Sequence, residues 1–292
     1  VVLIAIGTGM LMLPQMTTVC GGASFMTAFF TSVSASCVTG LIVQDTATFF
    51  TYKGHLVIMF LIQFGGIGIV SFATFFALFL KNGVGLKQQL IIQDFLSTDS
   101  LSSAKTLLSR VVLITLSIEA ISAILIFFTW GSKVQFPSLG MKIFHSIFHA
   151  ISAFCNAGFS LYSNGLYEME IRGSVLLHVV IGITVVMGGL GFSVIEDVFS
   201  PTALRERLEK PWKDWKLGTK VAIHTSLVLI IIGMGLYLLL EQNNTLKGMS
   251  TLEKIVASFF QSVSTRTAGF NTVDFSQLAN PTLVFMIFLM FI

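Results

Sequence analysis

The sequence has little charge. Asp, Glu, Lys and Arg make up 11% of its 292 residues, whereas ordinary soluble domains carry about 25%. Hydrophobic residues account for 54%, and the mean hydropathy is +0.87. This composition excludes a soluble domain and predicts a chain that lies in a lipid bilayer. The formal net charge of +3 rests on a few loop residues, and we expect no nucleic-acid partner.

Cysteine is also scarce. Cys20, Cys37 and Cys155 show neither the spacing of a disulfide framework nor that of a metal site. No signal peptide is expected, because there is no basic segment followed by a small-residue cleavage site. The chain begins inside one apolar run, Val1–Leu13, and ends inside another, Thr282–Ile292. We therefore expect it to be a piece of a longer protein.

Long apolar segments are present instead. A helix needs about 20 apolar residues to cross a bilayer, and four segments are predicted to do so: His55–Leu80, Leu107–Thr129, Ser174–Ile195 and Val221–Leu240. Three half-apolar segments are too short to cross: Ser24–Ala35, Met141–Ala153 and Ser250–Val263. Because backbone that does not span is tolerated at membrane depth only inside protein or beside water, we interpret these three as re-entrant pore helices.

Each short segment leads into a loop with a glycine, and a phenylalanine lies ten residues before that glycine. The pairs are Phe30 and Gly40, Phe148 and Gly158, and Phe259 and Gly269. This self-similarity indicates an internal repeat. The predicted fold is an all-α membrane protein of repeated span, pore helix, glycine loop and span units around a central pore. The units cover 1–80, 107–195 and 221–292, joined by cytoplasmic linkers 81–106 and 196–220.

The glycine loops have the composition of a cation filter. A bare cation in a low-dielectric medium costs tens of kcal/mol, and rings of backbone carbonyls can replace its water. Glycine adopts the required dihedrals without a Cβ penalty. One glycine after a helix is more often a simple cap, but three in register favour a filter. The predicted filter backbone is Val38, Thr39, Gly40, Asn156, Ala157, Gly158, Thr267, Ala268 and Gly269.

Other polar residues recur around these loops. Cys37, Cys155 and Arg266 each lie three residues before a loop glycine. Because a cation facing the pore axis would repel the transported ion, we expect Arg266 to point behind the filter and to pair with a carboxylate. Asp45 and Asp274 each lie five residues after a loop glycine. They could concentrate cations at the outer mouth, or serve as loop acids or helix caps.

Glu119, His145 and His149 are ionisable residues within predicted helices. Glu119 is in the middle of a span, where such groups are costly and functional by default. Ion handling and a buried hydrogen-bonding role between helices both remain open for it. His145 and His149 are spaced as metal ligands can be, but Ser146 stands where a zinc protease carries Glu, so a structural role is favoured.

Lys and Arg set the predicted orientation. Ten of the seventeen lie in loops 81–110 and 196–220, and seven lie on the side of the glycine loops. The positive-inside rule places the first group in the cytoplasm. The glycine loops then face outward.

Five motifs together resemble the superfamily of Trk, Ktr and HKT potassium transporters, and most closely the Ktr membrane subunits. They are CVTGLIVQDT (37–46), LIQFGGIG (61–68), FHAISAFCNAGF (148–159), GGLGF (188–192) and STRTAGFN (264–271). The resemblance covers essentially the whole chain. It implies four units around one pore, in a cell membrane that is expected to be the bacterial inner membrane. It also implies homodimers seated on a cytoplasmic nucleotide-binding ring of the KtrA or TrkA type. The fourth loop, and a glycine-rich gate, would lie beyond Ile292.

The predicted function is therefore potassium uptake by a pore-forming subunit, which is not an enzyme and holds no organic cofactor. The sequence leaves open whether potassium moves as through a channel or together with sodium. One alternative is a secondary solute transporter with broken helices and a midplane site, but this would require inverted repeats. Another is an intramembrane metalloprotease, which would lack its Glu and a third ligand.

Overall fold

The computed structural model describes residues 1–19, 21–68, 101–131, 134–199, 205, 208–209 and 215–291. Over these ranges the chain is helical, and its one β-bridge joins Thr17 to Phe50. The predicted all-α class is confirmed. Three parts of the predicted organisation lie outside the described residues: residues 81–100 of the linker 81–106, residues 200–204, 206–207 and 210–214 of the basic loop 196–220, and Cys20.

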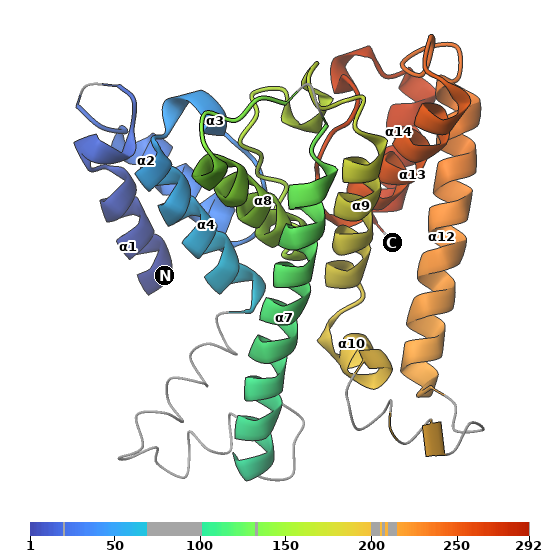
Figure 1. Cartoon of the computed structure of the whole chain (residues 1–292), viewed down its shortest axis with the longest axis horizontal. Helices are drawn as coiled ribbons and strands as arrows, with labels where there is room; N and C mark the ends of the chain where they lie inside the picture. The colour runs from blue at the N-terminus through green and yellow to red at the C-terminus, as the bar shows by residue number, and fades with distance from the viewer. Residues whose placement is uncertain are drawn as a thin grey trace.

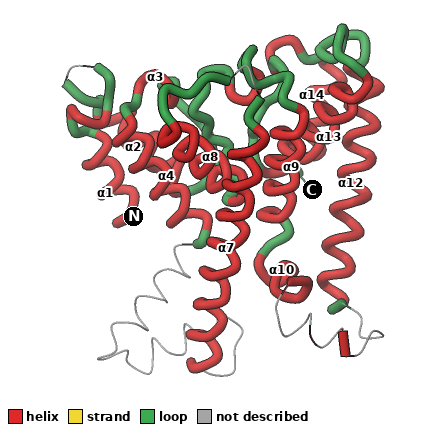
Figure 2. The backbone as a smooth tube through the Cα atoms, viewed as in Figure 1, coloured by secondary structure: helices red, strands yellow, loops and turns green. Residues whose placement is uncertain are grey.

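Nine of the helices in the described residues form three groups along the chain (Figures 1 and 2). The groups are α1 (Val2–Leu11), α2 (Phe25–Ser36) and α4 (Tyr52–Gly66); α7 (Leu101–Thr129), α8 (Leu139–Phe154) and α9 (Val175–Gly189); and α12 (Leu217–Glu241), α13 (Thr251–Thr267) and α14 (Asn280–Met290). Within each group the three helices contact one another. Between groups, α4 packs on α8 and α9 packs on α13, so the last helix of one group supports the middle helix of the next.

The short middle helices begin in the same way. Ser24, Ser138 and Ser250 are their N-caps, and each side chain accepts a hydrogen bond from a backbone amide in the first turn. A serine cap satisfies an amide that would otherwise lack a partner at a helix start. The three predicted short helices are therefore present as α2, α8 and α13, with ends shifted by a few residues. Their role as pore helices stays a prediction.

Shorter elements complete the described chain: η1 (Pro14–Met16), α3 (Thr46–Phe49), η2 (Gly165–Tyr167), α10 (Phe192–Phe199) and η3 (Phe275–Gln277). Most of them lie in the loops drawn at the top of Figure 1, whereas α10 lies at the bottom. Pro14 follows the end of α1, and Pro281 lies in the first turn of α14, as expected of residues that cannot donate a backbone hydrogen bond.

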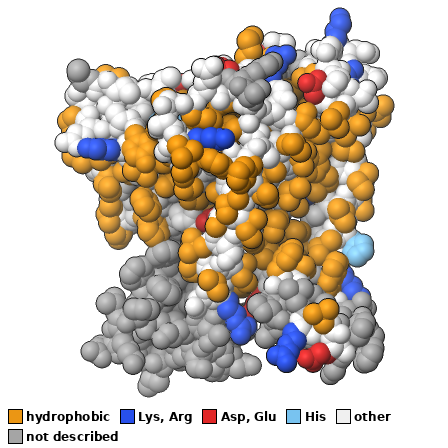
Figure 3. Space-filling model, in the orientation of Figure 1, with side chains coloured by type: hydrophobic (Ala, Val, Ile, Leu, Met, Phe, Trp, Pro, Cys, Tyr) orange, Lys and Arg blue, Asp and Glu red, His pale blue; other side chains and the backbone are white. Residues whose placement is uncertain are grey.

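Two helices of the described residues are long and apolar enough to cross a membrane, Ser109–Thr129 and Leu217–Glu241. Most of the apolar surface of the second is exposed, because only 17% of its most apolar window is buried. Figure 3 shows hydrophobic side chains in a band across the middle of the visible face, with Lys and Arg mostly toward its top and bottom. A surface of this kind fits a lipid environment.

Two predicted spans are not continuous helices. The segment Ser174–Ile195 is α9 and α10, separated at Leu190 and Gly191, and Gly191 has a φ of 80°. In His55–Leu80 the helix ends at Gly66, and Gly68 has a φ of 89°; residues from 69 on lie outside the described part. The helices break because left-handed glycines end a helix, although apolar composition persists through the Gly-Gly-x-Gly runs. That the two segments cross the membrane stays a prediction.

Candidate functional site

The three glycine loops, 37–41, 155–159 and 267–270, follow α2, α8 and α13. Their glycines are all left-handed, with φ of 77° at Gly40, 71° at Gly158 and 74° at Gly269. In the first two loops the residue two places earlier is also left-handed, with φ of 56° at Val38 and 57° at Asn156. In the third loop α13 continues through Thr267. Turns of this kind direct backbone groups in ways that a helix or strand does not.

Each loop is tied back onto its own short helix. The amides of Thr39 and Ala157 donate to the carbonyls of Ser34 and Ser152, both at 2.8 Å. These bonds have the spacing of a Schellman cap. In the third loop Gly269 donates to Ser264 at 3.0 Å.

Serine hydroxyls hold the residue after the glycine in the last two loops. Ser152 Oγ donates to the Phe159 carbonyl at 2.8 Å, and Ser264 Oγ donates to the Phe270 carbonyl at 2.6 Å. Both phenylalanine side chains are buried. The loop backbone is therefore fixed by hydrogen bonds to its own short helix and by packing of the two phenylalanine side chains.

The glycine loops touch one another in chain order. A Cβ atom placed on Gly40 would collide with the carbonyl oxygen of Ala157, and one placed on Gly158 would collide with that of Ala268. A Cβ on Gly269 would meet no atom of the described residues within 4 Å. Glycine is thus required at the first two positions for close approach as well as for its φ.

The end of α4 packs directly behind two of the loops. A Cβ on Gly65 would collide with the carbonyl oxygen of Ser36, next to the first loop. A Cβ on Gly66 would collide with the side chain of Cys155 in the second loop. The first glycine of the Gly-Gly-x-Gly run therefore supports the preceding loop, and the second supports the next one.

The end of α9 repeats this arrangement one group later. A Cβ on Gly188 would collide with the carbonyl oxygen of Phe154, whereas one on Gly189 would lie 3.8 Å from Asn156 Nδ2 and Thr267 Oγ1. With its amide turned so that both ends are satisfied, Asn156 accepts from Gly189 N and donates to Val185 O, each at 3.1 Å. Sequence reasoning found these glycine runs as repeat markers and missed their packing role.

One cavity brings together the three loop glycines and the two predicted mouth acids, whereas the other predicted filter residues are not on its wall. Its volume is about 390 Å³, and its lining includes Gly40, Gly158, Gly269, Asp45 and Asp274. These residues come from three helix groups that are far apart in the sequence. The cavity lies on the side of the loops after the glycines, where the sequence predicts an outer mouth.

The two acids hold the rim of this cavity. Asp45 caps α3 through the amide of Ala47 at 3.0 Å, and it accepts from Ser163 Oγ at 2.5 Å. Partial burial disfavours its charge, but the hydrogen bonds from Ser163, Thr48 and Ala47 outweigh this and lower the pKa of Asp45. Ser163 belongs to the second group, so this bond joins two loops. The sequence showed only that Ser163 occupies the position equivalent to the acids.

Asp274 caps η3 on the other side of the cavity. It accepts hydrogen bonds from the hydroxyl and the amide of Ser276, at 2.7 and 2.9 Å, and these lower its pKa. Nearby, Asn271 Nδ2 donates to the Asn164 carbonyl at 3.3 Å and joins the second and third loops. Both acids are therefore helix caps, and both residues also line the cavity. That they concentrate cations there stays a prediction.

The flanking residues differ among the loops. Cys37 is exposed, whereas Cys155 is half-buried. Arg266 borders a space of about 30 Å³ between α9 and α12, and its Nε is buried without a hydrogen-bond partner. No carboxylate of the described residues lies within ion-pair distance of Arg266, so the predicted pairing is wrong for this part of the chain. Its side chain does lie away from the cavity of the three glycines.

Buried polar groups lie behind the second loop. Glu119 is 5% exposed and accepts from Gln63 Nε2. His149 bonds the His145 carbonyl through Nδ1 at 2.8 Å and lies 3.3 Å from Ser160 Oγ through Nε2. His145 and His149 also pack on Tyr162. Among the described residues there is no cluster of three groups that could hold a metal, and the histidines are accounted for by packing.

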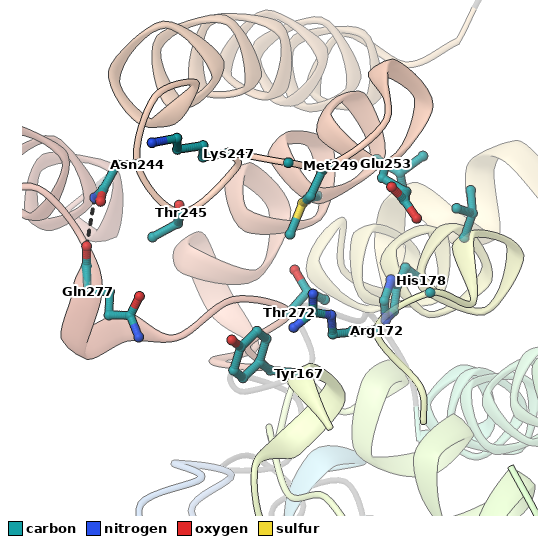
Figure 4. Close-up of a pocket in the computed structure, with 15 residues that line it drawn as sticks. Tyr167, Arg172, His178, Asn244, Thr245, Lys247, Met249, Glu253, Thr272 and Gln277 are labelled. Atoms are coloured by element: carbon teal, nitrogen blue, oxygen red, sulfur yellow. Dashed lines mark hydrogen bonds between the residues drawn. The ribbon is translucent and has the colours of Figure 1, made fainter. Parts of the chain in front are cut away.

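A second cavity, of about 500 Å³, lies between the second and third groups (Figure 4). Arg172, Lys247 and Glu253 are on its wall, and Asn244 Nδ2 closes one side by donating to the Gln277 carbonyl at 2.7 Å. None of the loop glycines lines it. Tyr167 lines both cavities, so the second cavity adjoins the candidate site without reaching its glycines.

Comparison with known proteins gives a consistent result. The family model of the TrkH cation transport proteins matches residues 4–292. The Ktr system potassium uptake protein B of Bacillus subtilis (strain 168) is 39% identical over 99% of this chain, and that of Vibrio alginolyticus is 34% identical over 93%. The potassium/sodium uptake protein NtpJ of Enterococcus hirae is 33% identical over 100%. The chain spans 62, 58 and 62% of the length of these relatives.

The fold points the same way. The crystal structure of the potassium transporter TrkH from Vibrio parahaemolyticus superposes with a TM-score of 0.63 over 99% of this chain and 53% of its own, at 19% identity. At that identity the likeness concerns the fold alone. The family match over almost the whole chain is independent of it, and this chain belongs to the TrkH family of cation transport proteins, a family of membrane transporters and not of enzymes.

Proposed function

We propose that this chain forms most of a potassium-conducting pore, in which backbone carbonyls of the three glycine loops bind the dehydrated ion. The single observation that carries the proposal is the shared cavity: Gly40, Gly158 and Gly269 come from equivalent positions and border one space. Their backbones are left-handed and held from behind by hydrogen bonds and close glycine contacts. A rigid arrangement of carbonyls around a cavity is what cation selectivity needs.

The contact order of the loops fits a ring. The first loop touches the second and the second touches the third, whereas Gly269 has open space beside it within the described residues. A fourth loop, outside this chain, would complete the circle between the third and the first. In this proposal the units are 1–80, 107–195 and 221–292, with the linkers 81–106 and 196–220 on the cytoplasmic side.

Charge at the mouth would raise the local cation concentration. Asp45 and Asp274 are both held ionised by their hydrogen bonds and both border the cavity. Carboxylates at a concave entrance attract cations and speed their arrival. Potassium is the proposed cargo. Sodium as a coupling ion is a secondary proposal, supported by the relative NtpJ of Enterococcus hirae, which is a potassium/sodium uptake protein.

Two further features of the proposal concern assembly. The relatives named as components of Ktr systems support a membrane subunit that works with others. We include a homodimer in the bacterial inner membrane, seated on a nucleotide-binding ring of the KtrA or TrkA type. The basic loop 196–220 would be the docking segment for that ring, and its residues 200–204, 206–207 and 210–214 lie outside the described residues.

A glycine substitution tests the filter. In the full-length transporter, Gly158→Ala would carry a left-handed alanine, which costs roughly 1–2 kcal/mol, and its methyl would push against the Ala268 carbonyl. We expect potassium-over-sodium selectivity to fall by on the order of tenfold, since about 1.4 kcal/mol of lost discrimination has that effect. The measurement is potassium uptake into potassium-depleted cells with sodium as competitor.

The matched control is Gly248→Ala. Gly248 also has a positive φ, 83°, and no neighbour within 4 Å, but it borders the second cavity. It should lose stability without losing selectivity. Unchanged selectivity in Gly158→Ala and Gly40→Ala, both inserted at wild-type levels, would refute the filter assignment.

A further inference from the structure

A buried carboxylate stands directly behind the second glycine loop. Glu119 lies in the middle of the span α7, and 5% of its surface is exposed. An acidic group at this depth is expensive and is rarely kept without a task. The ion pairs of the described residues, Arg110–Glu196 and Arg205–Glu209, do not involve Glu119. Its role must be sought in its hydrogen bonds.

These bonds join three elements. Gln63 Nε2, on α4, lies 3.0 Å from both carboxylate oxygens of Glu119. Cys155 Sγ lies 3.9 Å from Oε1. Gln63 Oε1 is buried with no hydrogen-bond partner, so the side chain of Gln63 directs its hydrogen bonding at Glu119. Glu119 thus connects the last helix of the first group, the first helix of the second group and the second glycine loop.

Cys155 is the C-cap of α8 and precedes Asn156, whose φ is 57°. Gly66, three residues after Gln63 on the same helix, packs against the Cys155 side chain. Moving α4 or Glu119 would therefore move Cys155. The strained turn that sets the direction of the Asn156 and Ala157 backbone follows immediately.

The next boundary is built differently. Val186 lies three residues before Gly189, as Gln63 lies three before Gly66, and Arg266 stands where the second loop has Cys155. There Val186, Ser226 and Arg266 border a small space of about 30 Å³, with no carboxylate on its wall. The arrangement of Gln63, Glu119 and Cys155 is therefore particular to the second loop and is not a general requirement of the fold.

We propose that Glu119 and Gln63 form a clamp that positions the second glycine loop and thereby sets ion selectivity. Glu119 is a positioning residue in this proposal and touches no ion. The inference rests on the proposed filter function of that loop. Its carrier is the hydrogen-bonded juxtaposition of Gln63, Glu119 and Cys155 on three elements.

The test uses five variants of the full-length transporter. Glu119→Ala and Gln63→Ala should each lower potassium-over-sodium selectivity by on the order of tenfold, the effect of losing a hydrogen bond to a charged group. The double variant should lose no more than either single one, because the two act as a unit. Glu119→Gln should restore selectivity. The oxygen of the new amide can accept from Gln63 Nε2, and its nitrogen can donate to Gln63 Oε1, which has no partner.

Ser122→Ala is the control for packing of α7. Thr184 Oγ1 donates to Ser122 Oγ at 3.0 Å, so this variant also removes a buried contact between α7 and α9, and it reaches no glycine loop. It should leave selectivity unchanged. Insertion and monodispersity are checked by size-exclusion chromatography of each variant, and if Glu119→Ala does not insert, Gln63→Ala decides alone.

Three results would overturn the clamp. The first is normal selectivity in an inserted Glu119→Ala or Gln63→Ala variant. The second is a loss of selectivity in Ser122→Ala equal to that in Glu119→Ala. The third is a Glu119→Gln variant that is as defective as Glu119→Ala while Gln63→Ala is normal, because this pattern would assign the effect to the charge of Glu119. If Gly158→Ala changes selectivity while Glu119→Ala and Gln63→Ala do not, the clamp fails and the filter stands; if Gly158→Ala and Gly40→Ala leave it unchanged as well, the filter assignment fails.

Discussion

Single residues adopt costly conformations around the candidate filter. Val38 is β-branched and has a φ of 56°, a region in which such residues are outliers. Strain of this kind persists only where the surroundings impose it, and it gathers at functional sites. Val38 packs against Gly65. A Cβ atom on Gly65 would lie 3.1 Å from Val38 Cγ2, so the glycine leaves room for that methyl group. Asn156 is the milder case, because asparagine tolerates the left-handed region.

Neutralising the mouth acids tests their electrostatic role. We expect Asp45→Asn with Asp274→Asn to raise the apparent KM for potassium, and to do so most at low ionic strength. The Debye length is about 30 Å at 0.01 M and about 8 Å at 0.15 M, so salt should mask the loss. The measurement is potassium uptake at several concentrations of an impermeant salt.

The pH dependence follows from the same groups. Hydrogen bonds hold the pKa of Asp45 and Asp274 below the ordinary value, which is about 3.9. Both carboxylates therefore stay charged as pH falls, until it passes through the lowered pKa. The wild-type salt dependence should persist from about pH 8 to pH 5. Glu253→Gln is the control, because Glu253 is an acid on the wall of the second cavity. If Asp45→Asn with Asp274→Asn raises the apparent KM equally at every salt concentration, the electrostatic role of the two acids is contradicted.

Elements are shaped by where they must end. The helices α4 and α9 are largely apolar, yet both stop at Gly-Gly-x-Gly runs. Stopping there allows Gly65 and Gly188 to lie against the loop of their own group, and Gly66 and Gly189 against the loop of the next. One short run thus supports two loops, which links neighbouring groups mechanically.

The two adjacent glycines of α9 make a matched pair. Gly188→Ala should force α9 away from the Phe154 carbonyl, an overpacking of roughly 1–3 kcal/mol. Gly189→Ala should be tolerated, because its new methyl would lie 3.8 Å or more from its neighbours. We expect lower thermal stability and weaker potassium uptake in the first variant alone. Equal behaviour of the two would show that the close contact at Gly188 has no part in holding the loop.

The face of the molecule visible in Figure 3 presents an apolar band, with Lys and Arg mostly toward its top and bottom. On α12, side chains such as Leu227, Ile231 and Leu239 are more than half exposed, which suits contact with lipid chains and would be costly in water. The helix α3, whose N-cap Asp45 lines the cavity, lies toward the top of Figure 1. The direction of ion uptake therefore depends on which end of the molecule faces outward.

Cysteine labelling tests the predicted orientation. Lys247 and Lys216 are both exposed and lie in opposite loops, after and before α12. In a background with Cys20, Cys37 and Cys155 replaced by serine, a membrane-impermeant thiol reagent should label Lys247→Cys in intact cells. Lys216→Cys should react only after the membrane is opened. The reverse pattern would show that the excess of Lys and Arg in loops 81–110 and 196–220 does not face the cytoplasm.

The sequence by itself determined the membrane class, the three short helices and the residues of the glycine loops, since apolar composition and a repeated glycine are local properties. It also indicated that Asp45 and Asp274 occupy equivalent places. Tertiary structure decided what those residues touch. That Gly40 abuts Ala157, that Glu119 reaches Gln63 and Cys155, and that Arg266 has no carboxylate beside it among the described residues depend on contacts between distant segments. Hydrophobicity is non-directional, so it places a helix in the membrane without fixing which neighbour its polar groups will meet.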